Sequence, residues 1–197
     1  MLTTTHKRPD ARATDRLHIQ THIMSGWCAA NQLPLTARER LFCMIAATIP
    51  DVDGLGIIIS EHWYTQFHHI MGHNLLFGVI VSTTLAIFST RKVLAFVAYC
   101  GLFHLHLLMD YWGSGRDWGI CYFWPFQSGP GSWWMNPYGW NFFSWQNITA
   151  AFVLLLWTVW IGYRKRRTPL ELLMPSLDRQ LVGLGNGTKV AATAGEA

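Results

Sequence analysis

A stretch of twenty residues without a formal charge, 71–90 (MGHNLLFGVIVSTTLAIFST), limits most strongly what this 197-residue chain can fold into. As an α-helix rising about 1.5 Å per residue, it would cross the roughly 30 Å hydrocarbon layer of a bilayer. The segments 93–109 and 147–163 are apolar over seventeen residues each, near the lower limit for a span. The sequence therefore predicts about three membrane-spanning helices.

Two shorter helices are expected before the first span, at about 15–31 and 37–49. Thr36 is well placed to cap the second of them, because Glu39 follows it at the spacing of a capping box. The predicted fold class is all-α, an integral membrane helical bundle with about three full spans and two shorter N-terminal helices.

The bundle is expected to occupy residues 15–167, between a polar tail at 1–14 and a flexible tail at 168–197. The segment 111–145 contains seven of the eleven tryptophans. Because tryptophan favours the headgroup layer, this aromatic-rich outer loop is expected to anchor the protein in the membrane. A lid or groove above a substrate is an alternative role for it.

Charged residues make up 13% of the chain, and its formal net charge is +4. The cations lie beside the apolar segments, at Arg38/Arg40, Arg91/Lys92 and 164–167, and do not form the basic stripe of a nucleic-acid-binding protein. The lipid bilayer is therefore the expected partner, and nucleic acid is not. The positive-inside rule puts these cations on the cytoplasmic side of the membrane.

Histidine and aspartate gather in short clusters beside the apolar segments. Burying a charged group in hydrocarbon costs roughly 2.5 kcal/mol or more, so such groups usually mark a functional site. Imidazole and carboxylate are also the usual ligands of hydrolytic metals. We therefore predict a site for a divalent metal, with zinc as the expected ion, near the outer membrane face. Its candidate ligands are His22, Asp51, Asp53, His68, His69, His73, His106 and Asp110.

His106 and Asp110 are four residues apart. On a helix this spacing puts both side chains on one face, with β-carbons about 5–6 Å apart, so that both can bind one ion. The alternative is a polar pair inside the bundle, in which the histidine simply donates to the aspartate. His104 points elsewhere and is expected to be a packed or interfacial residue.

Asp51 and Asp53 follow Pro50, and a proline disfavours helix at the residue before it. The helix should therefore end near Thr48 and leave both carboxylates in a turn. One carboxylate can then bind the metal while the other acts as general base or orients a ligand, so both are candidate catalytic residues. The alternative is a turn without a chemical role, since Asp and Gly are common in turns.

Three histidines lie within six residues at the start of the longest apolar segment. A helix there would pair His69 with His73, whereas a loop preceding the helix would pair His68 with His73. Both pairings are compatible with the spacing, so His68 and His69 are both kept as candidate ligands.

Four short motifs resemble, in order and approximate spacing, a bacterial inner-membrane family described as metal-dependent hydrolases and also as LexA-binding. They are Thr21-His22, Ile49-Pro50-Asp51-Val52-Asp53, His68 to His73 and His106 to Asp110, followed by Trp124-Pro125. In that family the third motif reads His-Arg-Gly-x-Thr-His-Ser. This chain keeps the two histidines as His68 and His73 but has His69, Ile70, Gly72 and Asn74 at the other four defined positions.

The resemblance implies an inner-membrane location and metal-dependent hydrolysis, and the charge pattern puts the site on the periplasmic side. More distantly, the order of the residues is similar to that of zinc-dependent phospholipase C and P1 nuclease, which cleave phosphodiesters at a zinc cluster. That similarity would carry over His22, Asp51 or Asp53, His68 or His73, His106 and Asp110. No histidine follows His106 here, so only part of such a cluster can form.

Three classes of function are compatible with these patterns. A metal-dependent hydrolase acting on a phosphodiester or another small-molecule or lipid-like substrate agrees best with the ligand types and the resemblance. A metal-binding transporter or sensor would need polar groups deeper in the spans, but between Asn74 and Ala98 there are only serines, threonines and loop cations. A non-catalytic membrane scaffold would use the histidines only to stabilise helix ends.

Overall fold

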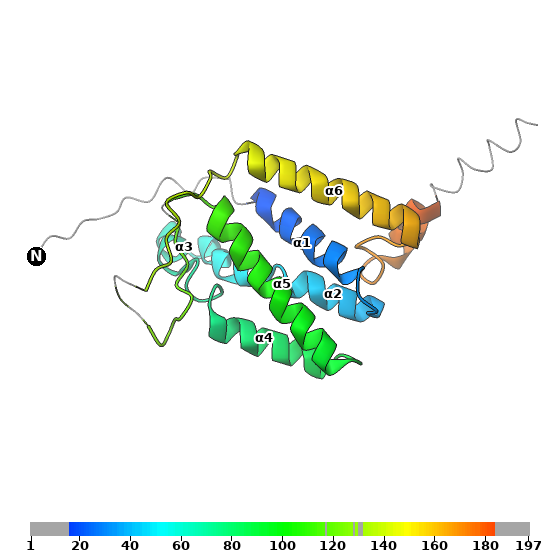
Figure 1. The fold of residues 1–197 in the computed structure, drawn as a ribbon, viewed down its shortest axis with the longest axis horizontal. Coiled ribbons are helices and arrows are strands. Elements are labelled where there is room, and N and C mark those ends of the chain that lie inside the picture. The colour runs from blue at the N-terminus through cyan, green and yellow to red at the C-terminus, as the bar shows by residue number, and fades with distance from the viewer. Residues whose placement is uncertain (1–15, 117, 128, 130–131, 184–197) are drawn as a thin grey trace, which may run out of the picture.

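A computed structural model describes residues 16–116, 118–127, 129 and 132–183, except for the side chains of 16–18 and 65–66. This part of the chain is helical, and its strand-like pairing is one isolated bridge between Ile120 and Trp134, which confirms the predicted all-α class. The predicted tail at 1–14 lies outside the described residues. The elements shown in Figure 1 are α1 (Arg16–Ala30), α2 (Ala37–Ala46), the 3₁₀ helix η1 (Ile49–Ile58), α3 (Glu61–Phe67), α4 (Leu75–Ile87), α5 (Lys92–Gly113) and α6 (Trp145–Lys165).

Helices α5 and α6, with 22 and 21 residues, are long and apolar enough to cross a membrane. Helix α2 and η1 reach the same length and hydropathy only together, as a pair bent by 55°. Helix α4 has 13 residues, which at about 1.5 Å each is too short for a roughly 30 Å layer. The prediction of a full span over 71–90 is therefore wrong, and the described residues contain two spanning helices, or three if the bent pair is one span.

The first four residues of the segment 71–90 form a loop, because Asn74 caps the helix that follows. The Asn74 side chain accepts a hydrogen bond from the backbone N–H of Phe77, at 2.8 Å. Its amide group donates to the carbonyl oxygens of Ile70 and Met71, also at 2.8 Å. Asparagine is among the strongest N-capping residues, so helix α4 begins at Leu75.

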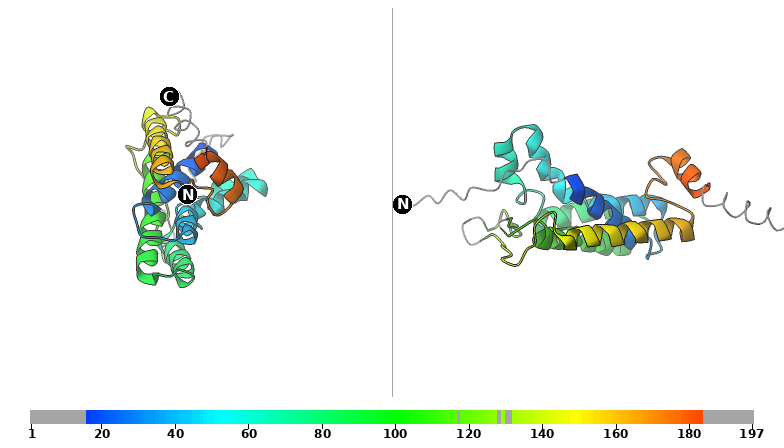
Figure 2. Two further views of the ribbon diagram at one scale, coloured as in Figure 1. Left: turned by 90° about the vertical axis from the view of Figure 1, so that its right-hand side faces the viewer. Right: turned by 90° about the horizontal axis from the view of Figure 1, so that it is seen from above.

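The helices alternate in direction along the bundle: α1, α4 and α6 run one way, and α2 and α5 run the other way (Figure 1). The end of α2, the start of α4 and the end of α5 consequently lie at the same end of the bundle. The segment formed by η1 and α3 projects from that end, as Figure 2 shows. The alternation brings together residues that are far apart in the sequence.

Two glycines let neighbouring helices approach closely. A β-carbon at Gly26 would lie 2.8 Å from the carbonyl oxygen of Cys43 in α2, and one at Gly78 would lie 2.7 Å from the ring of Phe103 in α5. Small residues at helix contacts are typical of membrane proteins, where close van der Waals packing holds helices together. The same core contains the buried alanines Ala30, Ala46, Ala47, Ala86 and Ala95.

Helix α6 lies along α1 at the edge of the bundle (Figure 1). Most of its apolar side chains are exposed; Ile148, Phe152 and Val159, for example, have 58–61% of their surface accessible. An apolar helix that hides so little of its surface inside the protein is stable only if hydrocarbon surrounds it. Helix α6 therefore has the surface of a lipid-facing helix.

Glu39 connects elements at the end of the bundle away from η1 and α3. The predicted capping box is confirmed, because Thr36 and Glu39 each accept a hydrogen bond from the other's backbone N–H. The second carboxylate oxygen of Glu39 accepts from both the backbone N–H and the hydroxyl of Thr90, at 2.8 Å each. Glu39 is only 1% exposed, so one buried carboxylate ties α2 to the turn between α4 and α5.

Residues after Arg167, expected to form a flexible tail, contact this same end as far as they are described. Residues 169–173 form turns and residues 175–183 form a short helix. The Arg40 guanidinium donates two hydrogen bonds to the carboxylate of Glu171, both at 2.6 Å. This paired contact holds the segment against α2.

Replacing Glu39 with alanine should destabilise the protein, because the backbone N–H groups of Thr36 and Thr90 then lose their acceptor. Each hydrogen bond to a charged group contributes about 1.5–3 kcal/mol, so the free energy of unfolding should fall by about 3 kcal/mol or more. Thermal unfolding in detergent measures the change. The control Glu61→Ala removes an exposed glutamate from α3 and should unfold near the wild-type temperature; equal unfolding temperatures of the two variants would contradict the prediction.

Candidate metal centre

Asp110 lies near the end of α5 and is only 4% exposed. Histidines from three segments contact its carboxylate. The Nε2 atom of His22 in α1 lies 3.2 Å from Oδ1, while the Nε2 atoms of His73 and His106 lie 3.2 and 3.1 Å from Oδ2. A buried carboxylate is costly unless it is compensated, so these contacts fix the positions of α1, α5 and the loop before α4.

Ligand atoms of four side chains converge on one point. One atom from each of Asp51, His73, His106 and Asp110 lies within 4.8 Å of the other three. The two Nε2 atoms are 3.2 Å apart, and they lie 3.9 Å (His73) and 3.5 Å (His106) from Oδ1 of Asp51. Atoms bound tetrahedrally to zinc at about 2.0–2.1 Å would lie about 3.3 Å from one another. The spacing of these two imidazoles and two carboxylates therefore fits a single ion.

The far nitrogens of both imidazoles are already engaged. Nδ1 of His106 lies 2.8 Å from the carbonyl oxygen of Ala47, which can only accept, so Nδ1 carries a proton. Nδ1 of His73 lies 3.1 Å from Oδ2 of Asp53 and donates in the same way. Each neutral ring then directs the lone pair of Nε2 into the centre, which is the arrangement found for metal-binding histidines.

Asp53 lies on the side of His73 that faces away from the centre and holds this ring in place. Its Oδ1 accepts from His68 at 2.7 Å, and its Oδ2 accepts from His73 at 3.1 Å and from the backbone N–H of Gly72 at 2.9 Å. Asp51 instead faces the centre, and its buried Oδ2 has no hydrogen-bond partner. Of the two carboxylates that the sequence left equivalent, the geometry favours Asp51 as the ligand and Asp53 as the residue that orients His73.

The local sequence explains how Asp51 reaches this position. Helix α2 ends at Ala46, close to the predicted end near Thr48. The chain then continues as η1 from Ile49, so the predicted turn is wrong and the carboxylates lie in a 3₁₀ helix. Pro50 can occupy the first turn of η1 because it has no N–H to satisfy there. The 55° bend between α2 and η1 brings Asp51 beside α5.

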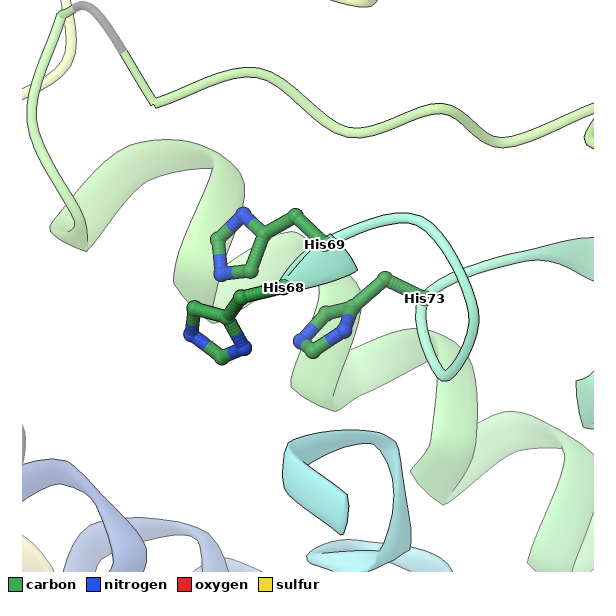
Figure 3. Close-up of side chains that lie close together, drawn as sticks. All are labelled: His68, His69 and His73. Carbon is green, nitrogen blue, oxygen red and sulfur yellow. The ribbon is translucent and has the colours of Figure 1, made fainter. Parts of the chain in front are cut away.

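His68, His69 and His73 come from the loop between α3 and α4, and their rings gather in one place (Figure 3), with centroids 4.2–5.4 Å apart. The helix that would have paired His69 with His73 is absent, because residues 68–74 are not helical and His69 has a φ of 68°. The alternative loop pairing agrees with the structure, since His68 and His73 both bind Asp53.

These three histidines form a second group in which an ion would fit by distance. Their nitrogens are nevertheless largely engaged: Nδ1 of His68 and of His73 face Asp53, and Nε2 of His69 accepts from the indole N–H of Trp118 at 3.0 Å. The four-residue set is therefore the better metal centre. His68 and His69 surround His73 and hold its loop in place.

His22 is a predicted ligand, whereas His104 is expected to lie outside the site. His22 is fully buried, and its ring centroid lies 3.9 Å from that of His106, so it adjoins the centre through the second oxygen of Asp110. His104 faces away, as expected. Its Nδ1 lies 2.7 Å from the carbonyl oxygen of Cys100, and its Nε2 lies 2.8 Å from the hydroxyl of Tyr122.

Without a metal ion, the carboxylates around His73 favour a second proton and a positive charge on its ring. Burial lowers the pKa of His73, but the carboxylates of Asp53 and Asp110 outweigh burial and raise that pKa to about 9. For His69, burial and the neighbouring His73 and His68 lower the pKa well below its usual value. A divalent cation among the four ligands would compensate the charge of Asp110 in place of that proton.

Three contacts at this site involve residues that the sequence analysis did not single out: the carbonyl of Ala47, the N–H of Gly72 and the indole of Trp118. Backbone groups carry no sequence signal, and Trp118 is one of seven tryptophans in its segment. A β-carbon at Gly72 would clash with the carbonyl oxygen of Pro50, so the loop can pass η1 this closely only with glycine at that position.

Comparison with known proteins identifies a family for this fold. A family model described as YdjM inner membrane protein matches residues 17–177. The match includes all eight candidate ligands and both apolar helices that are long enough to span a membrane. No curated protein and no solved structure matches the chain.

We expect the purified protein to bind one divalent ion per chain, as measured by elemental analysis and by titration with zinc. His106→Ala removes one of the four converging groups, and it should lower the affinity by more than the roughly 10–100-fold that an outer contact contributes. His104→Ala is the matched control, because the same residue type two positions away contacts Tyr122 instead. If both variants bind zinc equally well, the centre is not where these residues converge.

Asp53→Asn should lower the zinc affinity about 10–100-fold without abolishing binding, because the carboxylate orients His73 but is not a ligand. Titration with zinc measures the affinity, and the unfolding temperature is followed in parallel. Glu61→Gln makes the same chemical change at an exposed position and should have no effect. Complete loss of the ion in Asp53→Asn would instead identify Asp53 as a ligand.

Proposed function

This chain belongs to the YdjM inner membrane protein family, and from the geometry of its candidate metal centre we propose that it is a membrane-bound, metal-dependent hydrolase. The observation that carries the proposal is the convergence of His73, His106, Asp51 and Asp110, with both imidazole Nδ1 atoms already bound to acceptors. A histidine that only stabilised a helix end would need a single hydrogen-bond partner. Here, ligand atoms of four side chains point to one place, as expected for a metal site.

Zinc is the ion that we propose, because two imidazoles and two carboxylates form a nitrogen and oxygen set of the type and size that zinc binds. When bound, the ion polarises a carbonyl or phosphoryl oxygen and makes water acidic enough to lose a proton near neutral pH. His73 and His106 would hold it through Nε2, and Asp51 and Asp110 through one oxygen each; zinc can expand from four ligands to five, which would admit the water.

Asp51 is the proposed general base. Its buried Oδ2 has no hydrogen-bond partner, so it can take a proton from an attacking water molecule while Oδ1 faces the ion. Asp53 is a positioning residue, since it holds Nδ1 of His73 and touches no reacting group. His22 steadies the second oxygen of Asp110.

We place the centre on the periplasmic side of the membrane. Its residues lie at the opposite end of the bundle from the starts of α2 and α5 and the end of α6 (Figure 1). Those helix ends carry Arg40, Arg91 and Lys165, and the positive-inside rule puts basic residues in the cytoplasm. The tryptophan-rich segment 111–145 lies near the centre, because Trp118 hydrogen-bonds His69. In this position the segment can anchor the protein among headgroups and cover a substrate.

Hydrolysis by the zinc-loaded protein in lipid nanodiscs tests this function. Phosphodiester, carboxylic ester and amide substrates are compared, and we expect turnover on the phosphodiester that a chelator abolishes and zinc restores. Asp51→Asn should lower kcat at least about 100-fold, because it removes the base. Its zinc content should change much less, because the amide oxygen can still face the ion.

His104→Ala serves as the control for Asp51→Asn and should keep the wild-type rate, since its ring lies outside the centre. An unchanged kcat in Asp51→Asn would rule out the role of general base. A zinc-loaded protein without turnover on any substrate class would contradict hydrolysis itself.

A further inference from the structure

An apolar groove lies next to the metal centre, between η1, α3 and α4. Its volume is about 510 Å³, within the roughly 300–1,000 Å³ that is usual for small-molecule sites. Large apolar side chains form most of its wall, chiefly Leu55, Ile59, Trp63, Phe67, Leu76 and Ile80.

Two other residues of the wall belong to the support of the metal centre. The backbone N–H of Gly72 donates to Oδ2 of Asp53 at 2.9 Å, and the same oxygen lies 3.1 Å from Nδ1 of His73. The groove therefore ends at Asp53, on the Nδ1 side of His73, with the His73 ring between it and the proposed ion. A molecule held in the groove would lie one imidazole ring away from the centre.

The rim of the groove is apolar and uncovered. Ile59 is 70% exposed, Ile80 is 53% exposed, and the neighbouring Ile58 is 80% exposed. In an inner membrane protein a surface of this kind lies against hydrocarbon, because leaving it in water would be unfavourable. The groove is then open to the acyl chains of the bilayer, which are its nearest available ligands.

The polar side chains in the wall also favour a hydrocarbon ligand. The carboxylate of Asp53 and the amide of Asn74 both have their hydrogen-bond partners inside the protein. A peptide or a sugar would lose hydrogen bonds to water that these groups could not replace, whereas an acyl chain has none to lose.

We propose that the groove holds one acyl chain of a bilayer phospholipid, and that this lipid is the substrate, with its phosphodiester at the metal centre. The choice of substrate comes from the groove, and the chemical step rests on the proposed function. Water attacks the phosphorus and forms a new P–O bond, and the P–O bond to the leaving alcohol breaks. The proton that Asp51 takes from water passes to the leaving oxygen, so the products are a phosphomonoester and an alcohol.

The test of the groove uses nanodiscs of phosphatidylethanolamine and phosphatidylglycerol that contain a phospholipid with a photoreactive diazirine in its acyl chain. In the wild type, the label should attach to groove residues such as Leu55 and Phe67. The double variant Leu76→Trp/Ile80→Trp fills the groove and should reduce this labelling at least 5-fold. Val79→Trp, on the same helix but outside the groove, should leave the labelling unchanged, and unfolding temperatures verify that both variants fold.

Hydrolysis assays separate failure of the groove from failure of the proposed function. With phospholipid as substrate the double variant should lose at least about 10-fold in rate, while hydrolysis of the water-soluble bis(4-nitrophenyl) phosphate should be retained. Equal labelling of the wild type and the double variant would overturn the groove as a lipid site, even if both hydrolyse the soluble ester. Blocked labelling in a protein that hydrolyses neither substrate would contradict the proposed function and the choice of substrate, but not the binding of the acyl chain.

Discussion

The contact between the buried carboxylate of Asp110 and three histidines is the interaction on which this structure depends. An anion at that depth is unfavourable unless several partners compensate it. The partners come from α1, from the loop before α4 and from α5 itself. The Asp110 carboxylate therefore gains its partners only when this whole end of the bundle has assembled. The packing of the helices and the geometry of the centre depend on each other.

The two ends of the bundle use carboxylates in different ways. At the basic end, both oxygens of Glu39 accept hydrogen bonds from backbone N–H groups and hydroxyls, so its donors are fixed and the end is closed. At the other end, one oxygen of Asp51 has no partner, and two Nε2 lone pairs face each other at 3.2 Å. The first arrangement is complete as a protein structure. The second has four ligand atoms close enough together to hold a cation, and this contrast distinguishes a carboxylate with a structural role from a candidate ligand.

Much of this architecture could be predicted from the sequence, because it depends on local rules. The helical class, the capping box at Thr36 and the end of α2 before Pro50 follow from propensity and from the chemistry of helix ends. The clusters of histidine and aspartate also indicated correctly that these residues would meet in one site. Spacing on a helix placed His106 and Asp110 on a common face.

What the sequence could not predict depends on contacts between distant segments. The run at 71–90 has the composition of a full span, but Asn74 starts the helix late, and the loop before it carries His73 to Asp53. The different roles of Asp51 and Asp53 depend on which of them faces α5, and two acids in the same short motif contain no information about that. The bond from Trp118 to His69 is a further long-range contact without a sequence signal.

The position of α6 has a consequence for how such proteins can change. Helix α6 lies along α1 and supplies none of the groups that converge on the centre, all of which lie between residues 22 and 110. The four converging groups thus all precede the aromatic segment. We therefore expect the final third to tolerate lengthening, replacement or fusion to another module with little effect on the positions of these groups, provided that the surface of α1 stays covered.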